Sequence, residues 1–333
     1  MRIVALEEHV SLASFSAELE AQVPSERVLM GGAGAVRREL EDVDDLRLAS
    51  MDKAGITVQV LSVAGLGAAL LAPDASPEFA RRYNDALADV VRRHPDRYAS
   101  FAHVPMNAPQ AAADELERAV RDCGLLGALI SGQTNGKFLD DPMYAPLLAR
   151  AEALDVPIYI HPGVPPAQVN AVYYDGLSPF VSRQFAGAGW GWHAETAVHV
   201  LRMVLTGTFD RHPRLKIIIG HMGEGLPTML ARCDKVLSQK ITGLPRTVSQ
   251  TILDHVTITI SGFFTVVPYL AALLTFGADR ILFSVDYPFA DNGEARAFLD
   301  ALPAPPDEKL KIAHGNADRI LKIGQFAPAM ARP

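Results

Sequence analysis

Residues 215–224 read LKIIIGHMGE, a short run of apolar and mostly β-branched residues that ends in glycine and histidine. A continuous apolar run of this length is typical of a strand buried on both faces, as the strands of a parallel sheet are. Seven other runs have the same character. The eight predicted strands span residues 2–9, 57–62, 98–104, 126–131, 157–161, 215–221, 256–261 and 281–286.

Helical periodicity fills the stretches between these runs. The predicted helices span residues 76–93, 109–123, 142–154, 193–206, 226–236, 267–276, 294–302 and 307–323. Eight strands that alternate with helices indicate a single α/β domain over residues 1–333, folded as a closed (β/α)8 barrel, the TIM barrel. An open, doubly wound sheet is the alternative, because alternation by itself does not prove closure.

Two segments are too long to be simple connections, residues 11–45 after the first strand and residues 162–192 after the fifth. Both begin at the C-terminal end of a strand, where barrel enzymes carry their working loops. The second is rich in aromatic residues, namely Tyr173, Tyr174, Phe180, Phe185, Trp190 and Trp192. We interpret these long loops after strands one and five as the walls or lid of a pocket.

The composition restricts the partners and the compartment. The 333 residues carry a formal net charge of −7 without a block of like charge, which gives no reason to expect nucleic acid or an anionic membrane as a partner. The chain has no apolar run long enough to span a bilayer, and its first residues, MRIVALEEHV, lack the features of a signal peptide. Its two cysteines, Cys123 and Cys233, form no CxxC pair, which suits a reducing cytoplasm.

The first strand ends in LEEH, which contains Glu7, Glu8 and His9. Residues two apart in a strand point to the same side, so we expect Glu7 and His9 to share one face and Glu8 to point to the other. Two such ligands on the inward face can hold one cation.

Three other strands end in His161 (IYIHP), His221 (IIIGHMGE) and Asp286 (ILFSVDYP). A barrel brings strand ends together around one mouth, and imidazole with carboxylate suits Zn²⁺, Mn²⁺ or Fe²⁺. Each residue alone has an ordinary explanation, such as a hydrogen-bonded structural histidine or an aspartate that forms a turn. Together with Glu7 and His9 they are hard to explain by packing, because burying so many polar groups without a partner is costly.

These residues lie in segments that resemble the amidohydrolase superfamily. The likeness is to its branch of metal-dependent, non-oxidative decarboxylases, which contains the γ-resorcylate and 2,3-dihydroxybenzoate decarboxylases. The shared segments are ALEEH at 5–9, PIYIHP at 157–162, AETAVHVLRM at 194–203, FDRHPRLKIIIGHMGEGLP at 209–227, ADRILFSVDYPF at 278–289 and GNADRI at 315–320. The resemblance extends over nearly the whole chain.

The resemblance implies one divalent metal ion, zinc or manganese. Its implied ligands are Glu7, His9, His161 and Asp286. It also implies a catalytic pair, His221 and Glu224, which would be helical neighbours if a helix begins after Gly220. An acidic residue favoured at a helix N-terminus is the simpler explanation of Glu224.

Two positions concern substrate binding. Arg232 matches a family position and is a candidate for binding a carboxylate, with a surface ion pair as the simpler explanation. The related decarboxylases have asparagine after the Ser-Gly of strand seven, whereas this chain reads SGFF and has Phe263 there. A large apolar residue near the pocket puts the transfer of the exact substrate in question, though not that of the metal site.

The implied activity is decarboxylation of a hydroxybenzoate-like aromatic acid, in which Asp286 protonates the ring carbon. The alternative is a hydrolase or cyclase that uses the same site on an aryl ester, lactone or amide, with Asp286 as the base toward water. A barrel that only binds or regulates is a third possibility, and the coherent ligand set argues against it. The resemblance further implies a homo-oligomer, a dimer or a tetramer.

Overall fold

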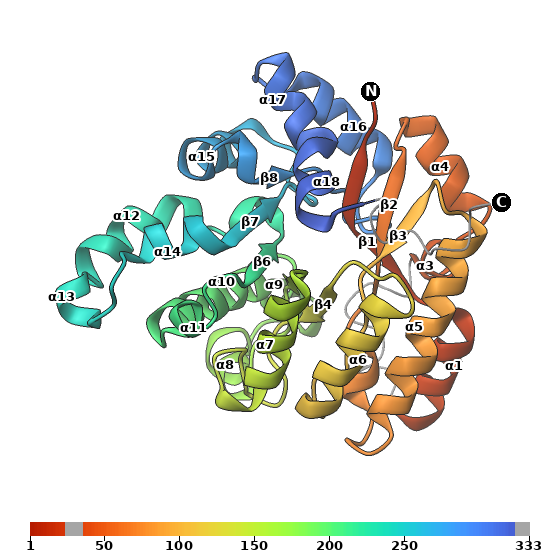
Figure 1. Cartoon of the computed structure of the whole chain (residues 1–333), viewed down its shortest axis with the longest axis horizontal. Coiled ribbons are helices and arrows are strands. Elements are labelled where there is room, and N and C mark those ends of the chain that lie inside the picture. Colours follow the sequence, from red (N-terminus) through yellow and green to blue (C-terminus); the bar gives the residue numbers. More distant parts are fainter. Residues whose placement is uncertain (24–35, 324–333) are drawn as a thin grey trace.

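The apolar runs form eight parallel strands that follow one another around a ring in the order of the chain (Figure 1). The computed structural model describes residues 1–23 and 36–323. Within them the strands are β1 Val4–Val10, β2 Val58–Val63, β3 Tyr98–Ser100, β4 Ala128–Ser131, β5 Pro157–His161, β6 Lys216–Ile219, β7 Val256–Thr259 and β8 Ile281–Leu282. Each lies inside or overlaps a run predicted from the sequence.

Two isolated bridges close the ring. Regular pairing gives a three-stranded sheet, β1-β2-β3, and a five-stranded sheet, β4-β5-β6-β7-β8. Ala102 bridges to Ala128 at one junction and Leu6 to Ser284 at the other, both in parallel orientation. The chain therefore forms the closed (β/α)8 barrel, and the open-sheet alternative is wrong.

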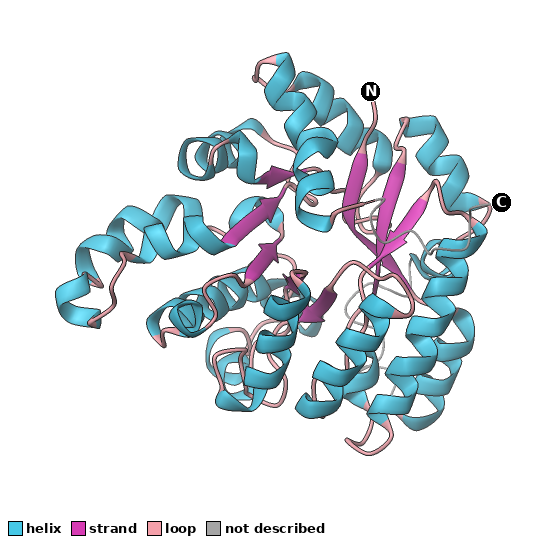
Figure 2. Ribbon diagram, viewed as in Figure 1, coloured by secondary structure: helices cyan, strands magenta, loops and turns pink. Residues whose placement is uncertain are grey.

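Helices surround the strands on the outside (Figure 2). The α-helices of the described residues are α1 Ala13–Gln22, α3 Arg37–Glu41, α4 Leu46–Ala54, α5 Ser76–Arg93, α6 Pro109–Arg121, α7 Ala145–Leu154, α8 Ala167–Tyr173, α9 Pro179–Ala186, α10 Gly191–Leu205, α11 Thr208–Arg211, α12 Leu226–Val236, α13 Gln239–Thr242, α14 Val248–His255, α15 Val266–Phe276, α16 Asn292–Ala301, α17 Pro306–Leu310 and α18 Asn316–Leu321. None of them is both long enough and apolar enough to cross a membrane.

Alternation along each strand divides the core into two layers. In β6, Ile217 and Ile219 pack in the layer beneath the helices, whereas Ile218 belongs to a smaller cluster that fills the barrel. Residues of α18, among them Ile320 and Leu321, join the inner cluster. All of these side chains are at most 6% exposed, which confirms that the strands are buried on both faces.

The long segments after β1 and β5 are not plain loops. The first forms α1 and α3, with residues 24–35 outside the described part, and the second forms α8 and α9. Such short helices give little periodicity to read, and α8 buries no residue at all. Of the aromatic residues in the second segment, Tyr173, Phe180, Phe185 and Trp190 are exposed.

His103 offers a test of the packing by pH. Its ring is buried, and its Nε2 accepts the N–H of Ala68 at 2.8 Å. Burial lowers the pKa of His103 to about 4. Between about pH 6.5 and pH 4 this histidine is therefore protonated in the unfolded chain but neutral in the folded one. Stability carried by the neutral ring is complete above about pH 6.5 and is lost as the pH falls toward 4, at a cost of roughly 2–3 kcal/mol.

We therefore expect His103→Gln, which keeps an acceptor that does not titrate, to lose less stability on acidification than the wild type. Urea unfolding at about pH 7.5 and about pH 4.5 measures the difference. The same substitution at the partly exposed His314 is the control. Equal losses in the wild type and in His103→Gln would contradict the assignment.

Candidate active site

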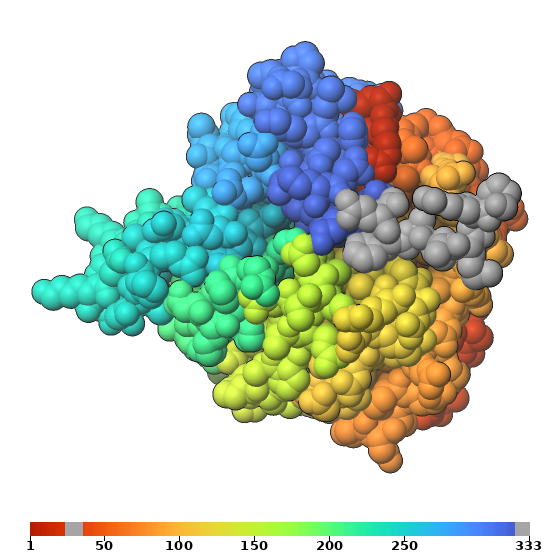
Figure 3. All heavy atoms as spheres, in the orientation of Figure 1, coloured from red at the N-terminus to blue at the C-terminus, as the bar shows by residue number. Residues whose placement is uncertain are grey.

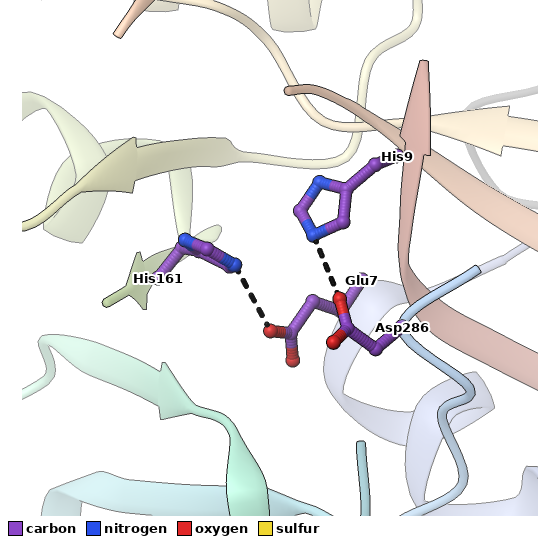
Figure 4. Close-up of side chains that lie close together, drawn as sticks. All are labelled: Glu7, His9, His161 and Asp286. Atoms are coloured by element: carbon purple, nitrogen blue, oxygen red, sulfur yellow. Dashed lines mark ion pairs between the residues drawn. The ribbon is translucent and has the colours of Figure 1, made fainter. Parts of the chain in front are cut away.

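Four side chains from three distant parts of the chain meet at the C-terminal mouth of the barrel (Figure 4). Glu7 and His9 come from β1, His161 ends β5, and Asp286 follows β8. His9 Nε2 lies 3.1 Å from Asp286 Oδ1, and His161 Nε2 lies 3.4 Å from Glu7 Oε1. One ligand atom of each residue lies within 4.8 Å of the others, so the four could hold a metal ion.

A bulge in β1 turns Glu7 toward this mouth. Leu6 belongs to the core inside the barrel, so regular alternation would point Glu7 outward. The register against β2 slips here, so that Leu6 and Glu7 together lie opposite Val60, and Glu7 takes a left-handed φ of 64°. The bulge places Glu7 and His9 inside and Glu8 outside, an arrangement that the sequence predicted without indicating its cause.

The Glu7 carboxylate is held by one oxygen only. The hydroxyls of Tyr159 and Ser261 both donate to Oε2. Oε1 is buried and has no hydrogen-bond partner among the described residues. Burial raises the pKa of Glu7, with His221 acting in the opposite sense, so a cation next to Oε1 would stabilise the charged form.

The two histidines of the group present ring nitrogens to the same point. His161 Nδ1 donates to the carbonyl of Pro162 at 2.8 Å, which leaves the lone pair of Nε2 facing Glu7. Burial, and then the charge of His9, lower the pKa of His161 to about 3, so its ring is neutral. His9 Nε2 is buried without a hydrogen-bond partner among the described residues, and its Nδ1 lies 3.3 Å from Ser62 Oγ.

These orphaned atoms fit a divalent cation. Buried polar atoms normally find a hydrogen-bond partner, and Glu7 Oε1 and His9 Nε2 have none in the described part of the chain. Neutral imidazole and carboxylate are ligands of zinc and of manganese. The predicted group is therefore brought together with the donor atoms that such an ion requires.

Asp286 is fixed through its backbone. Its φ is 75°, and the peptide N–H groups on either side of it, those of Val285 and Tyr287, donate to the buried Glu8 carboxylate at 2.9 and 3.3 Å. Burial would raise the pKa of Asp286, but the neighbouring His221 and His9 lower it below its usual range. Glu8, which the sequence placed on the outer face, thus shapes the site from behind.

Arg47 extends this support to His9. Its guanidinium is wholly buried, donates to the carbonyl of His9 and to Gln59 Oε1, and lies 4.6 Å from the centre of the Tyr287 ring. Sequence reasoning missed Arg47, which lies in α4, a helix that was not predicted. A buried arginine bonded to the backbone of a ligand residue restricts the position of that ligand.

His221 and Glu224 form the expected contact without the expected helix. His221 Nδ1 lies 2.8 Å from Glu224 Oε1. Residues 221–223 form a single tight turn with positive φ at His221 and Met222, Glu224 after it also has positive φ, and α12 begins only at Leu226. The helix that would have made them neighbours does not form after Gly220, yet the pair is intact. The chain reverses sharply because residues 221–225 all have positive φ, a conformation that Gly223 and Gly225 adopt without strain.

The charges around His221 favour its protonated form. Burial would lower the pKa of His221, but the carboxylates of Glu224 and Glu7 raise it well above its usual value. Its Nε2 lies 3.7 Å from Glu7 Oε1 and 3.8 Å from Asp286 Oδ2, so it faces the four-residue group. A histidine in this place can give or take a proton beside a bound substrate.

The two substrate-binding candidates lie in different places. The Phe263 ring packs edge-on against His221, with ring centres 5.7 Å apart. Arg232 is exposed on α12 and does not line the cavity beside the four-residue group. Arg232 therefore does not reach the cavity of the same chain, because its position on α12 faces the surface.

Comparison with known proteins assigns the family. The amidohydrolase family profile matches residues 11–323. The chain belongs to the amidohydrolase family. Gamma-resorcylate decarboxylase of Rhizobium radiobacter is 38% identical to it, over 96% of this chain and 98% of that protein. The resemblance inferred from the sequence motifs is confirmed.

Solved structures agree with the barrel. A 2,6-dihydroxybenzoate decarboxylase in complex with 2,6-dihydroxybenzoate is 36% identical, with a TM-score of 0.86 over 97% of this chain and 99% of that chain. A dihydroxybenzoic acid decarboxylase from Polaromonas sp. JS666, with bound manganese and the inhibitor 2-nitroresorcinol, is 34% identical, with a TM-score of 0.86 and 97% coverage of both chains. At these identities the likeness extends beyond the fold.

A cavity of about 140 Å³ opens beside the four-residue group of this amidohydrolase. Cavities of about 150 Å³ accommodate a benzene ring. His9, His161 and Asp286 form its polar floor, and Trp192 and Phe289 contribute aromatic walls. The segment after β1 supplies other parts of the wall, including Leu19, Arg37 and Leu40, and Ala188 comes from the segment after β5. Both long segments therefore line the cavity, as predicted.

The hydroxyl of Tyr159 gives a test of how Glu7 is held. We expect Tyr159→Phe to weaken Zn²⁺ or Mn²⁺ binding by roughly ten- to a hundredfold, because Glu7 loses a donor that orients it. Calorimetric titration of chelator-treated protein measures the change. Tyr98→Phe is the matched control, since it removes an equally buried hydroxyl that donates to Val43. Equal affinity in the wild type and in Tyr159→Phe would contradict this assignment.

Proposed function

We propose that this amidohydrolase is a metal-dependent, non-oxidative decarboxylase of a hydroxylated benzoic acid. The observation that carries the proposal is the convergence of Glu7, His9, His161 and Asp286 beside a cavity with aromatic walls. The names of its relatives, which are decarboxylases of dihydroxybenzoates, support the reaction class.

Glu7, His9, His161 and Asp286 are the proposed ligands of one divalent ion, zinc or manganese. When bound, such an ion supplies positive charge that attracts an aryl carboxylate and the oxygen of a neighbouring hydroxyl. The protein fixes the ligands in advance: Tyr159 and Ser261 orient Glu7, and Pro162 sets the tautomer of His161.

Asp286 is the proposed proton donor. Its proton passes to the ring carbon that bears the carboxylate, the bond between that carbon and the carboxylate breaks, and its electron pair restores the aromatic ring as CO₂ leaves. In the described chain His221 and His9 keep the pKa of Asp286 low. The negative charge of an arriving carboxylate and phenolate has the opposite effect, because like charge raises the pKa of a carboxyl group.

His221, oriented by Glu224, is the proposed group that handles the proton of the substrate hydroxyl. Its Nε2 faces Asp286 and Glu7, while Nδ1 bonds to Glu224. Glu7 is one of the carboxylates that favour the protonated form of His221, so a cation beside Glu7 would favour the neutral ring. A neutral imidazole in this position can accept the hydroxyl proton and return it when the product forms. Phe263 packs against His221 and does not line the cavity, so we propose that it acts on the substrate through the position of His221.

The decisive experiment is a substrate panel on metal-replete enzyme. We expect CO₂ release from 2,6-dihydroxybenzoate or a related hydroxybenzoate, in equal amount to the acid consumed. Asp286→Asn should reduce kcat by at least about a hundredfold, because the donor cannot supply its proton. Metal content measured on the same samples separates loss of the ion from loss of the donor.

The panel also contains aryl esters, lactones and amides. Turnover of these alone, with no CO₂ from any hydroxybenzoate, would replace the decarboxylase proposal by the hydrolase alternative. The barrel and the ligand group would be unaffected by that result.

We also propose that the chain forms a homo-oligomer, a dimer or a tetramer, in the cytoplasm. The segment α12–α13 projects from the side of the barrel (Figure 3). It exposes Met229, Val236 and Ile241, and α15 exposes Val267 and Leu274. Exposed apolar side chains of this size on neighbouring helices support a protein partner.

Light scattering coupled to size-exclusion chromatography should give a mass of at least twice the 35.9 kDa of the chain. Ile241→Asp should shift the population toward single chains, because it introduces a charge where an apolar contact is expected. A monomeric wild type would contradict the proposal.

A further inference from the structure

His193, in the first turn of α10, makes a second contact to the carboxylate that orients His221. Its Nδ1 lies 2.5 Å from Glu224 Oε2, while the other oxygen, Oε1, lies 2.8 Å from His221 Nδ1. The Glu224 side chain is 0% exposed. The carboxylate is therefore gripped from both sides by imidazole rings, of which the sequence motifs indicated only one.

The far side of the His193 ring faces the wall of the cavity. Trp192 donates its indole N–H to His193 Nε2 at 3.2 Å, and the carbonyl of Ala188 lies 3.0 Å from the same nitrogen. Both Trp192 and Ala188 line the cavity. The Trp192 indole N–H requires a lone pair on Nε2 and the Ala188 carbonyl requires a proton there, so these two contacts do not fix the tautomer. A carboxylate oxygen accepts hydrogen bonds, so the 2.5 Å contact to Glu224 Oε2 places a proton on His193 Nδ1.

Phe263 limits the hydrogen-bond partners that the His193 and His221 rings can have. It packs edge-on against His193 and His221, with ring centres 5.4 and 5.7 Å apart. A phenyl ring accepts no conventional hydrogen bond, so Glu224 is the acceptor available to both imidazoles on this side. The arrangement resembles a group that could hold a second ion. Hydrogen bonds explain it better, because the Nδ1 of each imidazole faces a different oxygen of the same carboxylate, which can accept from both.

We propose that His193 is a further positioning residue of the site, which holds Glu224 so that its other oxygen accepts the Nδ1–H of His221. The hydrogen-bonded series Trp192–His193–Glu224–His221 then links the wall of the substrate cavity to the histidine that faces the substrate. The inference rests on the proposed function for its kinetic consequence. The series of contacts itself does not depend on which substrate is used.

The test compares His193→Leu with His193→Asn. Leucine removes the hydrogen bond, and we expect kcat to fall by about tenfold or more while KM changes little, since a hydrogen bond to a charged group is lost behind His221. Asparagine can place an amide N–H near the position of Nδ1 and should restore most of kcat. Metal content and Tm are measured for both variants.

The control is His212→Ala. His212 also faces a glutamate, with Nδ1 3.4 Å from Glu152 Oε2, but it precedes β6 and lies at the opposite end of the barrel from the site. Its loss should leave kcat unchanged. Equal losses of kcat in His193→Leu and His193→Asn, or an unchanged kcat in His193→Leu, would overturn the proposal.

A second readout needs no turnover. In zinc-loaded protein labelled with ¹⁵N-histidine, the Nδ1 protons of His193 and His221 should give low-field resonances, because both bond to a carboxylate. His193→Leu should remove one resonance and shift the other, and an unshifted His221 signal would overturn the proposal. Failure of the wild type to release CO₂ would instead refute the decarboxylase function and leave this contact to be judged by the resonance alone.

Discussion

Glu7 places a carboxylate in the mouth of the barrel. Its Oε2 accepts hydrogen bonds from hydroxyl groups, whereas its Oε1 has no hydrogen-bond partner among the described residues. Isolating a carboxylate from water is costly, and three hydroxyl donors on one oxygen only partly replace the lost hydration. The second oxygen faces His161 and lies near His221. The residues around Glu7 Oε1 therefore surround a position that suits a cation, because a buried carboxylate oxygen without a hydrogen-bond partner is stabilised by positive charge beside it.

This arrangement is maintained by backbone conformations that residues other than glycine rarely adopt. Glu7, His221, Glu224 and Asp286 all have positive φ. Such conformations persist only where the surroundings hold them, and they are concentrated at functional sites. Here the surroundings are specific: a bulge in β1 holds Glu7, the Glu8 carboxylate holds the peptide groups beside Asp286, and the histidine contacts of Glu224 hold the turn after β6.

The barrel strands and the long connections contribute different parts of the site. Strand ends supply the groups that would hold an ion, and these are buried and rigidly supported. The segments after β1 and β5 supply most of the rest of the cavity, through residues such as Leu19, Leu40 and Trp192. Chemistry common to the family can thus be kept on the strands while the connections adapt the cavity to a particular substrate.

The sequence by itself determined the eight strands and the polar residues at their ends, because buried parallel strands read as apolar runs and a polar residue at the end of a run is conspicuous. It favoured the barrel over an open sheet, and the resemblance to the family selected the four proposed ligands among these residues. Only the tertiary structure decided how Glu7 comes to face inward, since the parity of a strand changes at a bulge that no local pattern marks.

The same holds for the groups that support the site. Glu8, Arg47 and His193 act through contacts with residues distant in sequence, and nothing in their own neighbourhood distinguishes them from ordinary charged residues. The sequence offered a helix after Gly220 as the way to bring His221 and Glu224 together, whereas a tight turn of residues with positive φ makes their contact. Hydrogen-bond partners are chosen by three-dimensional proximity, so these roles were fixed only when the barrel closed.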